Sequence, residues 1–187
     1  MVPTDAELAE QCLQGDNRGF DYLVKRYQKQ VTAFCYRILG DTNQASDAAQ
    51  EAFVKAYYAL ENFRQDALFL NWIMKIAANT CYDMLRKIGR TRTKSLYEDP
   101  IQADQLQSEE PSPEKIAINN EGHKLLWDAI QSLPVNHRMP LVLFHFHDMK
   151  LREIAEVLDR PEGTIKSSLH TARETLRRKL QGVIVEI

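Results

Sequence analysis

Two stretches of the chain combine basic and polar side chains at helical spacing, an arrangement suited to binding nucleic acid. In the C-terminal part, one outward stripe of a predicted helix carries Thr164, Lys166, Ser167, His170, Arg173 and Arg177. Short polar side chains near a helix N-terminus can enter the major groove of DNA, and later arginines can hold phosphates. This pattern favours DNA binding over its alternative, a helical hairpin with a cationic surface.

The second stretch lies in a predicted helix that begins near Leu68. Five residues recur along one side of it at spacings of three and four: Trp72, Lys75, Asn79, Asp83 and Arg86. Such a stripe suits stacking on unpaired bases, neutralising phosphates and bonding base edges. The residues alone leave a second interpretation open, in which Trp72 belongs to the core and the others form ordinary helix surface.

A third stripe is acidic and lies on the preceding predicted helix, for which Asp41 and Gln44 supply an N-terminal capping signal. One side of this helix is small and apolar, with Ala48, Ala49, Ala52, Phe53, Ala56 and Leu60. The other side carries Asp47, Gln50, Glu51, Val54 and Tyr58. On pattern alone, the acidic side is interpreted as a solvated face.

The composition predicts that these stripes belong to an all-α protein. Hydrophobic residues make up 44% of the chain and charged residues 27%, as in an ordinary soluble protein. Seven glycines and seven prolines are too few for a turn-rich β fold, and no strictly alternating strand pattern appears. A capping box at Thr4 and Glu7 opens a short first helix, and Gly40 predicts the end of a second.

A polar segment divides the chain into two predicted domains. Residues 91–113 keep no apolar period, contain three prolines and include an acidic run, so we interpret them as a flexible linker. The N-terminal helical domain then covers residues 1–90, and the C-terminal helical domain covers residues 114–187.

The C-terminal domain contains a predicted helix-turn-helix. A Leu-Pro pair at 133–134 ends one helix, and Asn136 is expected to cap the next. Further on, Ala155 is a small residue suited to a helix crossing, residues 159–163 form a turn, and Ile165 follows ten positions after Ala155. This spacing is typical of the helix-turn-helix.

Other classes of protein are disfavoured. The N-terminus lacks a signal-peptide signature and no apolar run approaches roughly 18 residues, so we expect a cytoplasmic protein that is not itself inserted in a membrane. The three cysteines, Cys12, Cys35 and Cys81, are interpreted as reduced thiols, and a metal site at His145 and His147 is disfavoured because the two diverge on a helix. No phosphate-cradling loop or nucleophile motif is visible, so neither an enzyme, a cofactor nor a small-molecule substrate is expected.

Considered together, the motifs are more specific than any one of them. In order, they are Asp47-Ala-Ala-Gln50-Glu51-Ala-Phe53, Asn62-Phe63-Arg64, Trp72, Asn79-x-x-x-Asp83-x-x-Arg86, Leu133-Pro134, Glu153-Ile154-Ala155 and Pro161-x-Gly163-Thr164-Ile165-Lys166-Ser167. Over nearly its whole length the chain resembles bacterial RNA polymerase sigma factors of the extracytoplasmic-function (ECF) group.

The resemblance implies a function in transcription initiation. Members of this family have two helical domains that bind core RNA polymerase and place it on promoter DNA, and an anti-sigma factor commonly holds them inactive. By resemblance, the surface that docks on the clamp helices of the largest polymerase subunit comprises Asp47, Gln50, Glu51, Phe53 and Val54. The outward residues of the helix-turn-helix named above are implied to read the minus-thirty-five element.

The resemblance also assigns the minus-ten element to the N-terminal domain. The residues implied to recognise and open it are Phe63, Arg64, Phe69, Trp72, Lys75, Asn79, Asp83 and Arg86. Residues 64–70 resemble the loop that captures a flipped base, and contacts on the order of 1–3 kcal/mol per base can offset unpairing. The acidic linker is expected to occupy basic channels of the polymerase toward the RNA exit.

The chain departs from the family pattern in two places. Residues 65–68 replace a small segment that usually contains glycine or serine, and Ser168 and Thr171 stand where arginines are common. Fewer cations in the last helix are expected to weaken phosphate contacts. The competing function is a free-standing helix-turn-helix regulator whose N-terminal domain senses a ligand or dimerises.

Overall fold

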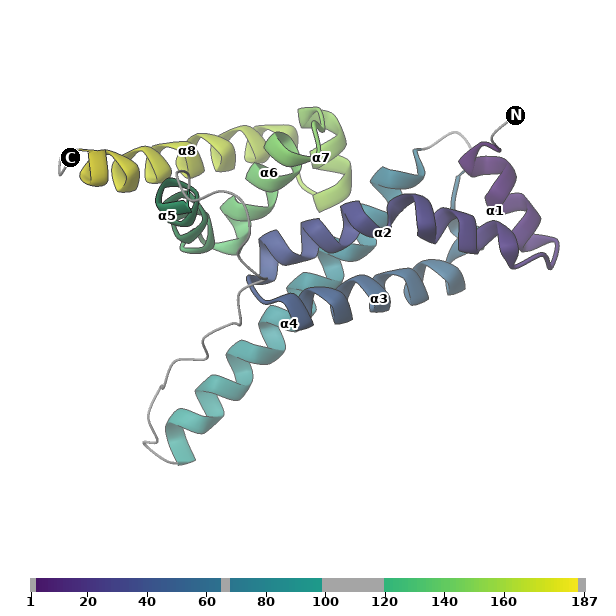
Figure 1. Ribbon diagram of the computed structural model, residues 1–187, viewed down its shortest axis with the longest axis horizontal. Coiled ribbons are helices and arrows are strands. Elements are labelled where there is room, and N and C mark those ends of the chain that lie inside the picture. Colours follow the sequence, from purple (N-terminus) through teal and green to yellow (C-terminus); the bar gives the residue numbers. More distant parts are fainter. Residues whose placement is uncertain (1–2, 65–67, 99–119, 185–187) are drawn as a thin grey trace. The chain divides into compact units, whose positions relative to one another are not determined.

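The computed structural model describes residues 3–64, 68–98 and 120–184, and in these ranges the regular secondary structure is all helical (Figure 1). The helices are α1 (Asp5–Leu13), α2 (Arg18–Leu39), α3 (Thr42–Tyr58), the 3-10 helix η1 (Leu60–Asn62), α4 (Phe69–Glu98), α5 (Asn120–Gln131), α6 (Val135–Phe146), α7 (Leu151–Leu158) and α8 (Glu162–Ile184). They form two compact units, an N-terminal one with α1–α4 and a C-terminal one with α5, α6, the first part of α7, and α8. The all-α fold class is confirmed.

The N-terminal unit is built around α2, which packs against α1, α3 and α4. Its largest fully buried side chains come from α2 and α4 and include Leu23, Phe34, Ile38, Phe69, Ile73 and Met74. The alanine side of α3 is buried as predicted, from Ala48 to Ala56. Because alanine side chains are short, α3 can approach both α2 and α4 closely.

Local signals set the helix boundaries of this unit. The Thr4 hydroxyl accepts a hydrogen bond from the Glu7 backbone N–H at 3.3 Å, and the Glu7 carboxylate accepts one from the Thr4 backbone N–H at 2.7 Å. The Asp41 carboxylate accepts from the Gln44 backbone N–H at 2.8 Å and so caps α3. Gly40 ends α2 with φ of 79°, a left-handed conformation that favours glycine. These three signals are confirmed.

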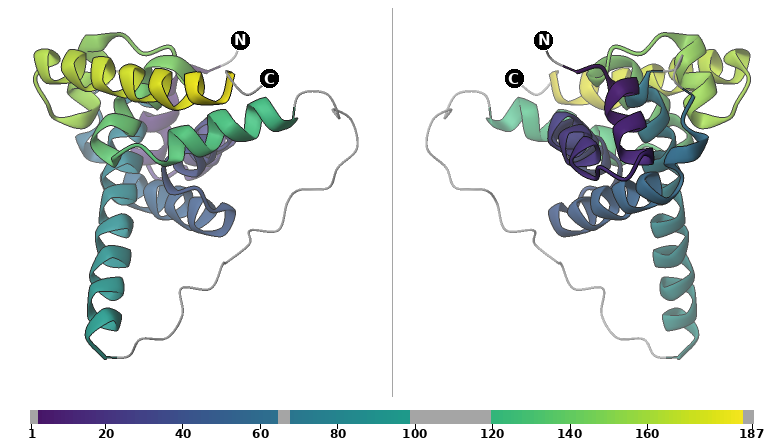
Figure 2. Two further views of the ribbon diagram at one scale, coloured as in Figure 1. Left: turned by 90° about the vertical axis from the view of Figure 1, so that its left-hand side faces the viewer. Right: turned by 90° about the vertical axis from the view of Figure 1, so that its right-hand side faces the viewer.

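Helix α4 is longer than predicted, because it continues through residues 91–98 of the expected linker. Figure 2 shows its last turns projecting beyond α2 and α3. The segment after Gly89 has no further helix breaker until Pro100, and a proline disfavours the helical conformation of the residue before it. The rest of the expected linker, residues 99–113, lies outside the described residues, so the predicted domain boundaries stay predictions.

The C-terminal unit packs α8 against α5 and α6. Its largest fully buried side chains include Met139, Leu143, Ile154 and Ile165. The α8 helix begins at Glu162, so the turn after α7 is shorter than the predicted 159–163.

The prediction that Asn136 caps α6 is wrong. Pro134, with φ of −53° and ψ of 140°, occupies the cap position, and α6 begins at Val135. Asn136 therefore lies inside the first turn, where its side-chain oxygen accepts a hydrogen bond from the Arg160 guanidinium at 2.7 Å. This bond ties the turn after α7 to the start of α6.

The contact between α1 and α2 predicts an unusual response to an added methyl group. A Cβ at Gly19 would lie 2.3 Å from the backbone oxygen of Leu8, so α1 would have to move. We expect Gly19→Ala to lower the free energy of unfolding by about 1–3 kcal/mol, although alanine normally favours a helix. Denaturant unfolding followed by circular dichroism measures this change.

Gly122→Ala is the matched control, because a Cβ at Gly122 has no atom within 4 Å. In α5 the same substitution should be neutral or stabilising by about 0.5–1 kcal/mol. Equal effects of the two substitutions would contradict the close contact between α1 and α2.

Candidate protein and nucleic-acid interfaces

The outer side of α3 combines charge with exposed apolar surface. Asp47 and Gln50 are exposed and Glu51 is half-buried. Further along the same side, Val54 is 55% exposed and Tyr58 is 79% exposed. Solvated helix faces are normally polar, whereas protein interfaces combine aromatic and aliphatic side chains with a polar rim. The α3 surface, defined as these five residues, therefore has the composition of a protein-docking site.

Phe53 does not belong to this exposed surface. Its side chain is only 8% exposed and lies among the buried residues of α3. The expectation that Phe53 contacts a partner directly therefore needs correction: within this unit it packs in the core and supports the helix that carries Asp47 and Glu51.

Lys55 connects the α3 surface to α4, a role that the sequence did not predict. Its ammonium group lies 2.7 Å from a Glu51 carboxylate oxygen and donates to the Thr80 hydroxyl at 3.2 Å. Thr80 is fully buried on α4. The spacing of four between Glu51 and Lys55 was a visible signal for the ion pair, but the link to Thr80 depends on how α3 and α4 pack.

Aromatic side chains cluster at the start of α4. The ring centroids of Phe63, Phe69 and Trp72 lie 5.3–5.5 Å from one another, and Tyr27 of α2 lies 5.4 Å from Phe69. Phe63 and Phe69 are buried, whereas Trp72 is half-buried. Trp72 packs on the core with one part of its indole and keeps another part accessible, and its stacking on an unpaired base stays a prediction.

The burial of Phe63 and Phe69 corrects their expected role as DNA contacts. A phenyl ring inside the core cannot stack on a base, but it can fix the orientation of a neighbouring indole. We therefore assign the two phenylalanines to the support of Trp72.

Helix α1 contacts this aromatic cluster through Asp5, which binds Tyr27. The Tyr27 hydroxyl donates a hydrogen bond to the Asp5 carboxylate at 2.5 Å, and Arg26 pairs with the same carboxylate. Burial and the bond to Asp5 raise the pKa of Tyr27 to about 12. Tyr27 is therefore a neutral donor at physiological pH, fixed between α1 and Phe69.

The polar stripe of α4 continues from the cluster. Asn79 and Arg86 are exposed, while Lys75 and Asp83 are half-buried. Asp83 accepts a hydrogen bond from Arg86 at 2.9 Å and so orients its guanidinium. Arg64 is exposed, but residues 65–67 of the expected base-capturing loop lie outside the described residues, so that loop stays a prediction.

The six predicted residues of α8 all lie exposed on the same helix: Thr164, Lys166, Ser167, His170, Arg173 and Arg177. On the opposite side, Ile165, Leu169 and Ala172 are buried. The backbone N–H groups of Thr164 and Ile165 donate to the Pro161 carbonyl oxygen at 2.9 and 3.1 Å, which closes the first turn of α8. The helix-turn-helix therefore presents a polar and basic face.

Ser168 is 5% exposed, which changes the meaning of one departure from the family pattern. The Ser168 side chain therefore packs inside the unit and does not itself belong to the exposed face of α8. Thr171 is exposed, and the expected weakening of phosphate contacts by the missing cations stays a prediction.

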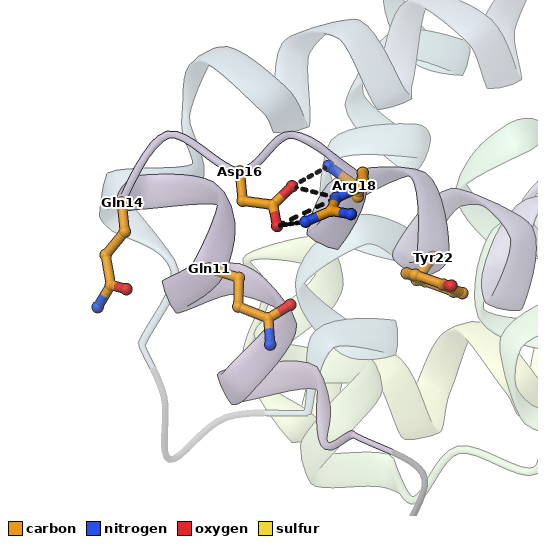
Figure 3. A pocket seen from close by; sticks show the side chains of 5 residues that line it. All are labelled: Gln11, Gln14, Asp16, Arg18 and Tyr22. Atoms are coloured by element: carbon orange, nitrogen blue, oxygen red, sulfur yellow. Dashed lines mark hydrogen bonds and ion pairs between the residues drawn. The ribbon is translucent and has the colours of Figure 1, made fainter.

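A hollow between the end of α1 and the start of α2 lies apart from all of these residues (Figure 3). Gln11, Gln14, Asp16, Arg18 and Tyr22 line it. Asp16 and Arg18 bond to each other across 2.7 Å, and this bond lowers the pKa of Asp16. The charged groups in the hollow thus satisfy one another.

The cysteines and histidines show no metal site in the part of the chain that the structure describes, where no group of three or more potential ligands lies together. Across the same residues, none of the helices has both the length and the apolar character needed to span a membrane.

All three cysteines are free, and Cys35 and Cys81 are buried. A hydrogen bond with Cys35 and burial raise the pKa of the Cys81 thiol, which favours its protonated form.

Comparison with known proteins accounts for both units. The Sigma-70 region 2 family matches residues 23–91, and the Sigma-70, region 4 family matches residues 123–176. The RNA polymerase sigma-H factor of Pseudomonas aeruginosa is 37% identical over 186 residues, which cover 97% of this chain and 96% of that protein. The ECF RNA polymerase sigma-E factor of Escherichia coli is 36% identical with the same coverage.

Solved structures share the fold. The sigma factor RpoE from Bartonella quintana, in complex with the anti-sigma factor NepR, has a TM-score of 0.70 at 20% identity over 87% of this chain and 96% of that chain. CnrH, in complex with the cytosolic domain of CnrY, has a TM-score of 0.65 at 23% identity over 95% and 97%. These likenesses show the fold, and the sequence matches show the family. The chain therefore belongs to the extracytoplasmic-function group of bacterial sigma factors.

Proposed function

We propose that this chain binds core RNA polymerase and directs it to specific promoters by reading the minus-thirty-five element and opening the minus-ten element. The observation that carries the proposal is the sequence match to ECF sigma factors over 97% of the chain. The exposed faces of α3, α4 and α8 add three separate surfaces of suitable chemistry to this match.

The α3 surface is the proposed dock for the polymerase clamp helices. Asp47, Gln50 and Glu51 supply hydrogen-bond acceptors and charge, and Val54 adds apolar area next to them. Charged groups of this kind steer association and select the partner, while the apolar groups lose water on docking.

The start of α4 is the proposed site of strand opening. Trp72 packs against the buried rings of Phe63 and Phe69 and keeps part of its indole accessible. This arrangement suits stacking on an unpaired nucleotide base. Asn79 can bond base edges, and Lys75 and Arg86 can neutralise phosphates of the adjoining strand. No covalent bond is made or broken in these steps, so this function requires no catalytic residue.

The exposed face of α8 is the proposed reader of the minus-thirty-five element. Thr164, Lys166 and Ser167 lie near the helix N-terminus, where short side chains can reach base edges in the major groove. Arg173 and Arg177 lie further along and can bind phosphates.

We further propose that the protein acts in the cytoplasm and is held inactive by an anti-sigma factor. RpoE of Bartonella quintana was solved with such a factor, NepR. A protein that covers the α3 surface would block the proposed polymerase dock. The acidic residues of the expected linker, which include Asp104, Glu109 and Glu110, would lie in basic channels of the polymerase.

Run-off transcription with purified chain and core polymerase tests the function. We expect transcripts from a specific subset of a genomic promoter pool when both proteins are present, and none with either protein alone. Lack of any specific transcript, together with tight operator binding by the chain alone, would instead support a free-standing helix-turn-helix regulator.

Asp47→Lys tests the polymerase dock. Asp47 is exposed, so reversal of its charge should leave the fold intact but place a cation where the partner complements a carboxylate. We expect the variant to lose co-purification with core polymerase, while its thermal unfolding stays close to that of the wild type.

Asp21→Lys provides the matched control, because Asp21 is an exposed carboxylate on α2, outside the α3 surface. This variant should still assemble with core polymerase. Normal assembly of Asp47→Lys, or equal loss in both variants, would overturn the assignment of the α3 surface.

A further inference from the structure

Arg173, in the DNA-facing stripe of α8, is contacted by two neighbouring side chains of α6. Its guanidinium carbon lies 5.2 Å from the centroid of the Phe144 ring. One of its terminal nitrogens lies 3.3 Å from Nε2 of His145. The His145 ring in turn packs edge-on against Phe144, with 5.0 Å between the ring centroids. The three side chains therefore form one continuous contact on the packed pair α6 and α8.

The chemistry of this contact determines the direction of the hydrogen bond. A guanidinium has only donors, so Nε2 of His145 must accept, and the imidazole must be neutral with its proton on Nδ1. Burial, together with the positive charge of Arg173, lowers the pKa of His145. The neutral acceptor form therefore predominates near pH 7.

We propose that His145 is a positioning residue for Arg173 in promoter recognition. The imidazole engages one donor of the guanidinium and Phe144 supports its face, which leaves other donors for a DNA phosphate. A long side chain held in place before binding loses less conformational entropy when the complex forms. This inference rests on the proposed function, in which Arg173 contacts the minus-thirty-five DNA.

This role differs from metal binding together with His147, which the divergence of the two positions on a helix disfavours. Positions 145 and 173 are far apart in the chain, and only the packing of α6 on α8 brings them together. His145 lies outside α8, so a survey of that helix alone would overlook it.

The test uses holoenzyme assembled from core polymerase and the full chain. Its binding to a labelled duplex is measured by fluorescence anisotropy, and the duplex carries the minus-thirty-five element of a promoter transcribed in the run-off assay. We expect His145→Leu to weaken binding about 2- to 10-fold, the range for releasing one long side chain. His145→Gln retains an acceptor oxygen and should bind close to wild type. In an Arg173→Ala background, His145→Leu should have no further effect.

Arg177→Ala supplies the matched background, because Arg177 lies on the same stripe and pairs with Glu174 at 3.2 Å. In the Arg177→Ala background, His145→Leu should weaken binding by the same factor as it does in the wild-type background. The inference is overturned if His145→Leu binds like wild type, if its effect adds to that of Arg173→Ala, or if His145→Gln is as weak as His145→Leu. If Arg173→Ala itself binds like wild type, the proposed role of Arg173 fails, and the inference fails with it.

Discussion

The buried aromatic contact at the start of α4 is the constraint on which the N-terminal surfaces depend. Phe69 is fully buried and touches Tyr27, Phe63 and Trp72. It therefore fixes both the entry of the chain into α4 and the orientation of the half-buried indole. A stacking side chain that is oriented before it meets DNA does not have to be ordered on binding. The same few rings thus serve core packing and the proposed recognition of a base.

Helix α3 connects this proposed DNA-binding region to the proposed polymerase dock. Its alanines bring α3 close to α4, and Lys55 joins Glu51 on the outer surface to buried Thr80. A partner bound at the α3 surface would therefore lie one helix away from the residues proposed to open the strands. This closeness would let one small unit carry both proposed functions without a separate transmitting element.

Periodicity in the sequence was sufficient to predict the helices and their exposed stripes, because buried residues on one side of a helix recur every three to four positions. It could not separate Phe53, Phe63 and Phe69 from exposed contacts, since an aromatic residue suits both a core and an interface. Periodicity also could not predict contacts between distant segments, such as the one between Arg173 and His145. Family resemblance supplied the functions of the stripes, and the structure showed which of their side chains are accessible.

The most direct measurement is the fluorescence of 2-aminopurine placed in the minus-ten element of a promoter that the holoenzyme transcribes. The account predicts an increase, reporting an unstacked base, with wild-type holoenzyme and none with the chain or the core alone. With Trp72→Ala holoenzyme, which keeps the α8 face, binding to the minus-thirty-five element should persist while the increase is lost. An increase with the chain alone, or a full increase with Trp72→Ala, would contradict the account.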